Sequence, residues 1–224
     1  MVKLNRVIKN IKNYFSSIEK SKQSVGQINR DTEEGQILER LIKQNKIAKV
    51  LEIGTWNGLG STKTILEVLD ENIDQYYFTS IESDIIFYKR ALKNLKSELN
   101  KNDQIFLGRI IEIEELPDIE DIDFEKFGFD PKNIEWYIQD LRRYKKIKNI
   151  YHLLPKEFDL IFLDGGEFST YPEFLKLYKK TKFLCLDDTD TYKQFDVINY
   201  INDNKETFEI YEEMPGFAVY KVNN

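Results

Sequence analysis

Three glycines stand close together in residues 50–60, Val-Leu-Glu-Ile-Gly-Thr-Trp-Asn-Gly-Leu-Gly. Apolar residues before the first glycine are typical of the end of a buried strand, and residues 61–69 have the pattern of a helix. Glycines between a strand and a helix let a ligand approach the backbone, where free N–H groups at the helix start can bind it. The segment therefore predicts a site for a nucleoside-bearing ligand.

The glycine spacing discriminates between such ligands. A dinucleotide fingerprint has the form G-x-G-x-x-G, with an acidic residue about 20 positions later. Here the order is Gly54-x-x-x-Gly58-x-Gly60, and the next acidic residue at a strand end, Glu82, lies 28 positions after Gly54. This favours a cofactor without a pyrophosphate over NAD. The alternative is an ordinary strand-loop-helix of an α/β protein, with glycines for tight turns.

Carboxylates follow two other apolar runs. Asp164 comes after residues 158–163, and Asp187 and Asp188 come after residues 183–186. The carboxyl ends of parallel strands meet at the edge where ligands of open α/β folds bind, so we expect the three side chains to converge there. Their repulsion calls for a cation or a shared proton, most simply Mg²⁺. The alternative is that one aspartate caps a helix and another is solvated.

The elements that must position these residues alternate along the chain. The patterns predict strands near 48–53, 77–82, 104–108, 158–164 and 182–187, and helices near 61–71, 84–99, 170–180 and 192–203. Two further apolar stretches, around Met214 and Pro215, predict an antiparallel strand pair. We expect one α/β domain over residues 1–224, with a mostly parallel sheet, helices on both faces and the antiparallel pair at its end.

Two segments lie outside this alternation. Residues 1–47 are expected to be helical, with one helix from the apolar period of residues 7–18 and a second capped by Asp31 or Thr32. Residues 109–157 form an insertion, with eight acidic residues in 112–125, five basic residues in 142–148 and aromatic residues between. We expect the insertion to pack over one edge of the sheet, where it shapes either the acceptor pocket or an oligomer interface.

Bulk properties narrow the class of protein. The net charge of −6 argues against broad nucleic-acid binding, and no apolar run is long enough for a membrane span. The single Cys185 excludes an internal disulfide and, with the absence of a signal-like start, predicts a cytoplasmic protein. Residues 1–49 carry 11 Lys/Arg against 5 Asp/Glu. This basic segment suits an anionic substrate, a membrane surface or the acidic face of a partner, and the alternative is a solvated amphipathic helix.

At the glycine loop the chain resembles the class I S-adenosylmethionine-dependent methyltransferases. Their first motif has an acidic residue two positions before a glycine, as in Glu52-Ile53-Gly54-Thr55-Trp56-Asn57-Gly58, although Trp56 stands where the family usually has another glycine. The resemblance implies a Rossmann-like methyltransferase sandwich with S-adenosyl-L-methionine as cofactor. Glu82 would accept hydrogen bonds from the ribose hydroxyls of this cofactor. The implied cofactor site consists of Glu52, Gly54, Thr55, Trp56, Gly58, Ser61, Glu82 and Asp164.

A strand ending in Asp-Gly, then one ending in Asp-Asp, resembles the metal-dependent O-methyltransferases of macrolide sugars and catechols. The resemblance implies that Asp164, Asp187 and Asp188 hold a metal ion that binds the acceptor hydroxyl and aligns it with the sulfonium methyl group.

The base that takes the acceptor's proton is less clear from the sequence. Similar proteins often have a histidine after the Asp-Gly, where this chain has Phe168, so Glu167, Asp190 or the metal would manage the proton. The only histidine, His152, precedes the fourth strand and is predicted to be structural. The predicted catalytic residues are Asp164, Asp188 and Asp190.

These observations predict an O-methyltransferase that acts on a hydroxyl of a small polar acceptor, with a sugar or an anionic nucleotide-sugar first, as in carbohydrate biosynthesis. A homo-oligomer fits the same interpretation. Two alternatives stay open. An NAD(P)-dependent oxidoreductase shares the architecture, although the glycine spacing and the lack of a suitable Tyr-x-x-x-Lys pair disfavour it. A binding or assembly protein with this fold and no activity is kept open by Trp56 and Phe168.

Overall fold

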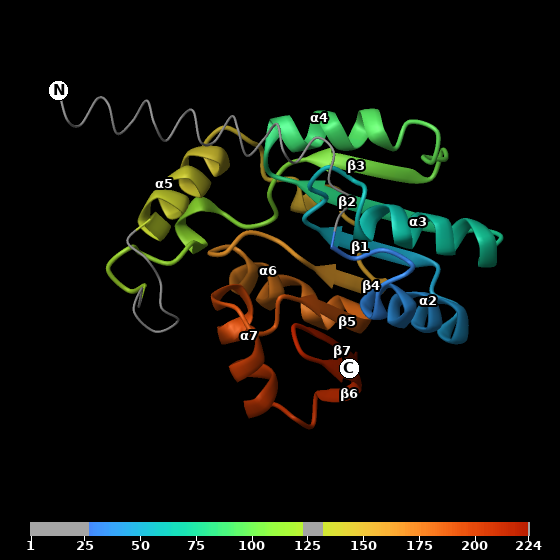
Figure 1. Cartoon of the computed structure of the whole chain (residues 1–224). Coiled ribbons are helices and arrows are strands. Elements are labelled where there is room, and N and C mark those ends of the chain that lie inside the picture. Colours follow the sequence, from blue (N-terminus) through green and yellow to red (C-terminus); the bar gives the residue numbers. More distant parts are fainter. Residues whose placement is uncertain (1–26, 123–131, 224) are drawn as a thin grey trace.

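The structure, a computed structural model, describes residues 27–122 and 132–223 (Figure 1). The helix expected within residues 7–18 lies outside the described residues. Within the described part of the chain, no helix is both long enough and apolar enough to cross a membrane.

One seven-stranded sheet runs through the molecule in the order β3-β2-β1-β4-β5-β7-β6. Its first five strands are parallel, whereas β7 runs antiparallel to β5 and β6 antiparallel to β7. The predicted mostly parallel sheet with an antiparallel end is thereby confirmed. The strands are β1 (Lys49–Ile53), β2 (Tyr77–Glu82), β3 (Asp103–Leu107), β4 (Phe158–Leu163), β5 (Thr181–Asp187), β6 (Phe208–Met214) and β7 (Phe217–Val222).

Helices cover both faces of the sheet (Figure 1). Alternate residues of β4 separate the two layers, because Phe162 packs with Leu41 and Leu66 of one face, while Leu163 packs with Phe174 and Val197 of the other. Burial on both faces explains why the central strands are continuous apolar runs. The helices are α2 (Glu33–Asn45), α3 (Ser61–Asn72), α4 (Ile85–Asn94), α5 (Lys132–Tyr144), α6 (Thr170–Leu177) and α7 (Tyr192–Asp203), with 3-10 turns at Ile113–Glu115, Tyr151–Leu153 and Tyr178–Lys180.

Helix ends depart from the predictions in two places. The helix expected over 84–99 ends at Asn94, because Leu95 leaves helical geometry and a separate turn carries Leu99. The helix expected over 170–180 ends at Leu177 and continues as a 3-10 turn. In both cases the apolar period outlasts the helix, since the turn that follows still buries an apolar side chain.

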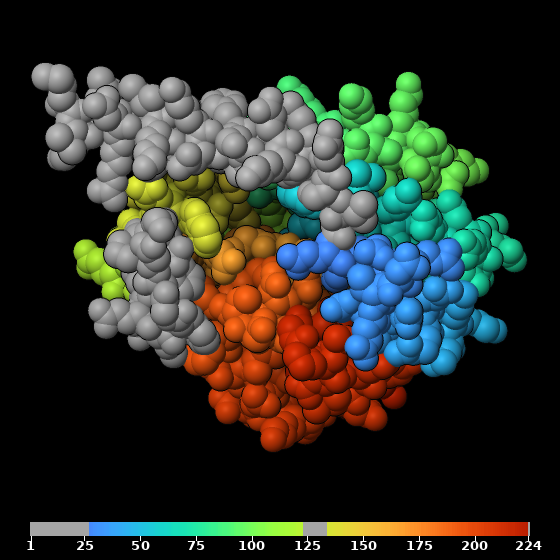
Figure 2. Space-filling view, viewed as in Figure 1, coloured from blue at the N-terminus to red at the C-terminus, as the bar shows by residue number. Residues whose placement is uncertain are grey.

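Helix α2, near the start of the described chain, packs against the C-terminal strands. Thr32, one of the two predicted caps, accepts the N–H of Gly35 at 3.2 Å. Along the helix, Arg40 pairs with Glu212 of β6 at 2.5 Å. The space-filling view shows blue α2 lying against red C-terminal residues (Figure 2). Its apolar side packs into the same core as β5 and β7, which closes that face of the sheet.

The insertion at 109–157 begins with a parallel bridge between Arg109 and Asn149. Helix α5 buries Tyr137 and Tyr144 in the core shared with α6 and α7. The Tyr144 hydroxyl donates to Glu173 of α6 at 2.9 Å. These contacts place α5 beside α6, which directly follows the Asp164-Gly165-Gly166 segment.

Candidate functional site

The glycine loop starts directly at the end of β1. Gly54 has φ +99°, and a Cβ there would lie 1.9 Å from the backbone oxygen of Asp164, so only glycine fits. Its N–H donates to Ile81 of β2 at 2.9 Å. Trp56 has φ +50°, which explains why the resembled family usually has glycine at that position. The loop is therefore built tightly across the ends of β1, β2 and β4.

Glu52 lies beneath this loop and is fully buried. Its carboxylate accepts the hydroxyls of Ser61 and Thr62, both at 2.7 Å, and that of Ser80 at 2.6 Å. Burial raises the pKa of Glu52, and the three hydroxyl donors oppose that rise. The carboxylate thereby fixes the start of α3 against β1 and β2, and the predicted contact of Glu52 with the cofactor stays a prediction.

Glu82 ends β2 on the other side of the loop. One carboxylate oxygen accepts the N–H of Trp56 and the other accepts the N–H of Asp84, each at 2.7 Å. Burial raises the pKa of Glu82 to about 7, against the effect of the two backbone donors. Each oxygen keeps a further lone pair, which is what two ribose hydroxyls would need.

A cavity of about 400 Å³ opens above the carboxyl ends of β1, β4 and β5. Five of the predicted cofactor residues line it, namely Gly54, Thr55, Trp56, Ser61 and Asp164, together with Gln27, Ile28, Gly60, Asp187 and Asp188. Glu52, Gly58 and Glu82 lie outside its lining. A larger cavity, of about 700 Å³, is lined by residues 70–74, 76 and 100–102. Those residues precede β2 and β3, so that cavity lies at the opposite end of the sheet.

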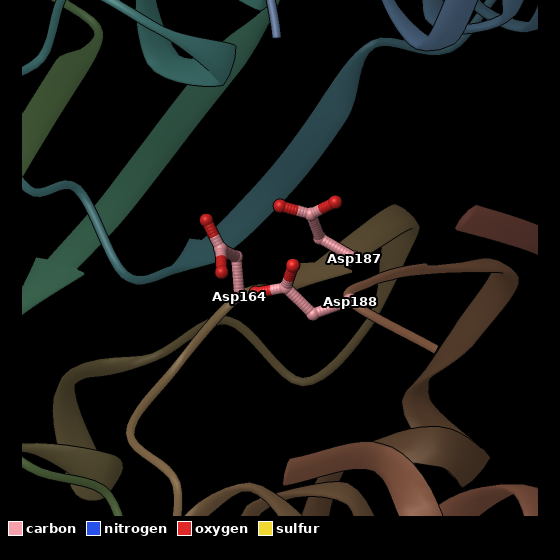
Figure 3. A group of neighbouring side chains, drawn as sticks. All are labelled: Asp164, Asp187 and Asp188. Carbon is pink, nitrogen blue, oxygen red and sulfur yellow. The ribbon is translucent and has the colours of Figure 1, made fainter. Parts of the chain in front are cut away.

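Three aspartates gather on one wall of the smaller cavity (Figure 3). Asp164 follows β4, Asp187 ends β5, and Asp188 follows with φ +57°. One oxygen of each lies within 4.8 Å of those of the other two. Burial raises the pKa of Asp164 to about 6 and that of Asp187 to about 7. For Asp187, the neighbouring carboxylates of Asp164 and Asp188 add to the rise.

Lys193, which sequence reasoning missed, reaches this cluster from the first turn of α7. Its Nζ lies 2.6 Å from Asp164 Oδ1 and 2.6 Å from Asp188 Oδ2, and its side chain is only 4% exposed. A divalent ion on the same oxygens would face this ammonium group. The donor set as it stands therefore does not fit a metal ion. The only sequence signal was a lysine in the first turn of the helix that follows Asp187 and Asp188.

The other candidates for a proton acceptor are not among the residues that line the cavity. Asp190 is exposed in the turn before α7 and does not line the cavity. Phe168, at the position of the family's histidine, is buried with its ring 5.2 Å from that of Tyr137 and 5.8 Å from that of Tyr192. Glu167 is partly buried, which raises its pKa, while Lys193 opposes the rise. Of the two predicted catalytic carboxylates that line the cavity, Asp188 is the more open to an acceptor, at 40% side-chain exposure against 31% for Asp164.

Comparisons with known proteins bear on the fold. No protein-family model matches the sequence, and no curated protein matches it. An O-methyltransferase from Bacillus cereus, solved in complex with SAH, has a TM-score of 0.57 at 10% identity, over 96% of this chain and 91% of that one. A methyltransferase from Geobacter sulfurreducens has a TM-score of 0.55 at 13% identity, over 100% and 97%. The O-methyltransferase TomG of tomaymycin synthesis from Streptomyces achromogenes, solved with SAM, has a TM-score of 0.52 at 15% identity, over 85% and 79%.

These structures share the strand arrangement described above, with identities that speak for the fold alone. The resemblance drawn from the glycine loop is confirmed at the level of the fold. The chain has the class I S-adenosylmethionine-dependent methyltransferase fold.

Proposed function

We propose that this protein is an S-adenosylmethionine-dependent O-methyltransferase acting on a hydroxyl group of a small polar acceptor. One observation supports this most strongly. A cavity of about 400 Å³ lies at the carboxyl ends of the strands, and both the glycine loop and the three aspartates line it. In open α/β folds this is the place where ligands bind.

The residues divide into two groups. The glycine loop and the start of α3 offer backbone N–H groups and space to the cofactor, and Glu82 accepts the ribose hydroxyls. S-adenosylmethionine, when bound, supplies an electrophilic methyl group on a positively charged sulfur. The aspartates would attract that positive charge. The carboxylate of Asp188 would take the acceptor's proton as the O–C bond to the methyl group forms and its S–C bond breaks, which leaves S-adenosylhomocysteine.

For the acceptor we propose a neutral sugar ahead of a nucleotide-sugar. Among the described residues, none of the basic side chains on which the expected anionic acceptor rested lines the cavity. Residues 1–26 lie outside the described chain, and Arg143 of the 142–148 group pairs with Asp84 and Asp140 at 3.1 Å each. The wall itself carries carboxylates, which repel a diphosphate. Magnesium is left out of this proposal because Lys193 already contacts two of its three expected ligands.

A transfer assay tests the proposal. The protein is incubated with S-adenosylmethionine carrying a labelled methyl group and with a panel of neutral sugars and nucleotide-sugars. We expect label in an acceptor, a loss of at least 100-fold in Asp188→Asn because a positioned base contributes about 10²–10⁴-fold, and no loss in Asp203→Asn at the exposed end of α7. Equal rates in Asp188→Asn and the wild type would remove Asp188 from the mechanism. Tight S-adenosylhomocysteine binding with no transfer to any acceptor would favour the alternative of a binding protein.

A further inference from the structure

Lys193 is a buried charge, and buried charges need partners. Transferring an unpaired ammonium group into a protein interior costs several kcal/mol, so such a lysine is stable only beside anions. Asp164 and Asp188 meet that need, each at 2.6 Å from Nζ. The same contacts let the two carboxylates stand close together, because the ammonium group offsets their mutual repulsion.

The backbone around Lys193 leaves it little freedom to withdraw. The neighbouring Gln194 is fully buried, and its side-chain amide donates to the carbonyl oxygens of Leu163 and Asp187, both at 3.0 Å. These oxygens end β4 and β5, so the first turn of α7 is tied to the strand ends that carry the aspartates. The position of the ammonium group is thereby a property of the fold.

A divalent ion would compete for the same oxygens. Mg²⁺ binds carboxylate oxygens at about 2.1 Å, so an ion that shared an oxygen with Lys193 would lie within about 5 Å of the ammonium nitrogen. Like charges at that distance repel strongly in a partly buried site. Of the three carboxylates that converge, only that of Asp187 has no contact with Lys193 among the described ion pairs.

We propose that Lys193 is the resident cation of this cluster and takes the place of a divalent metal ion. It is a positioning residue that holds Asp164 and Asp188 side by side on the cavity wall. Only the consequence for catalysis, turnover without a divalent ion, rests on the proposed function. The preference for lysine over metal can be measured whether or not an acceptor is found.

Binding of Mn²⁺ tests the proposal without turnover. Free Mn²⁺ is followed by electron paramagnetic resonance during titration of the full-length wild type, Lys193→Met and Lys205→Met, the last an exposed lysine just beyond α7. In the wild type and in Lys205→Met we expect no saturable binding of Mn²⁺ at concentrations below about 1 mM, the order of magnitude that separates a metal site from weak binding to surface carboxylates. Lys193→Met should gain a saturable Mn²⁺ site whose dissociation constant lies at least tenfold below that limit. Saturable micromolar binding by the wild type that Asp188→Asn abolishes would overturn the proposal.

Two further measurements test the proposal even if the Lys193→Met variant fails to fold. Lys193→Arg keeps the charge and should, like the wild type, show no rise in unfolding temperature with Mn²⁺. A rise of several degrees in the metal-saturated wild type would contradict the proposal, because a ligand that binds only the folded state stabilises it. Where an acceptor has been found, turnover should persist in EDTA, whereas loss in EDTA with recovery in Mg²⁺ would overturn the inference.

Discussion

Both oxygens of the Glu82 carboxylate already accept a backbone N–H, from Trp56 and from Asp84. A ribose diol would add two more donors to the same charged group. Replacing Glu82 with glutamine removes the charge and turns an amide group toward one backbone N–H. We expect the dissociation constant of S-adenosylhomocysteine to rise about 10- to 100-fold, since hydrogen bonds to charged groups contribute about 1.5–3 kcal/mol.

Calorimetric titration measures this change. Glu209→Gln, on an exposed position of β6, is the matched control. The unfolding temperature of Glu82→Gln without ligand shows whether the loop itself is disturbed. A dissociation constant within threefold of the wild type, in a normally stable variant, would remove Glu82 from the ribose site.

Glu173 carries a pH dependence of stability. It is fully buried, accepts the Tyr144 hydroxyl at 2.9 Å, and has one oxygen without a partner among the described residues. Burial raises its pKa to about 7 from the ordinary 4.5. Because the folded pKa is the higher one, the stability from neutral Glu173 is complete below pH 4.5 and is lost as pH rises through 7.

Glu173→Gln should abolish this loss. We expect the free energy of unfolding of the variant to gain on that of the wild type between pH 5 and pH 8, as measured by urea titration at both values. Glu82 and Asp187 have raised pKa values in both proteins, so only the difference between the proteins is informative. If the free energies of unfolding of the variant and the wild type differ by the same amount at both pH values, Glu173 does not titrate as described.

At the scale of elements, the loop after β1 depends on Gly54. An alanine Cβ there would meet the backbone oxygen of Asp164 at 1.9 Å, and φ is +99°. Backbone of β1 and β4 would have to separate, so we expect Gly54→Ala to lose about 3 kcal/mol or more of unfolding free energy and to weaken S-adenosylhomocysteine binding. In Gly166→Ala the nearest atom is the Ser169 hydroxyl at 3.1 Å, which can move.

Urea unfolding and calorimetry of the two variants make the comparison. We expect Gly166→Ala to lose less than about 1.5 kcal/mol, in the ordinary range for a tolerated substitution. Equal losses in both variants would mean that the close approach of β1 and β4 at Gly54 does not limit the loop.

The elements themselves were largely predictable, and the reason is visible in β4 and β5. Apolar runs bounded by Asp164 and by Asp187 mark strands buried on both faces, which local pattern reveals. The length of α4 was not predictable, because the apolar period continues through Leu95 and Leu99 in turns that still face the core. Pattern reports which side chains are buried and is less informative about where a helix stops.

The site was predictable where it depends on strand ends and on glycines. Strand ends and glycines placed Gly54, Thr55, Trp56 and Asp164 at one cavity. The role of Glu52 and the arrival of Lys193 depend on which elements meet in space, since Glu52 is satisfied by hydroxyls of α3 and β2, and Lys193 comes from α7. A lysine in a helix is ordinarily solvated, so the place of Lys193 in the first turn after Asp187 and Asp188 did not by itself predict its burial beside two aspartates.

At the scale of the whole molecule, the architecture ties the site to the entire sheet. The cavity takes its walls from β1, β4 and β5, and the helices that follow these strands pack on opposite faces. A ligand held there contacts residues from both halves of the sheet. Binding should therefore stabilise the fold as a unit against unfolding.

Thermal unfolding with and without S-adenosylhomocysteine, with NAD as the comparison ligand, tests the central claim most directly. A ligand at 100 times its dissociation constant stabilises a folded protein by about 2.7 kcal/mol. For a chain of this size that corresponds to a rise of roughly 5–10 °C in the unfolding temperature. We predict this rise with S-adenosylhomocysteine and none with NAD. A rise with NAD alone would contradict the account, because it would assign the glycine loop to a dinucleotide.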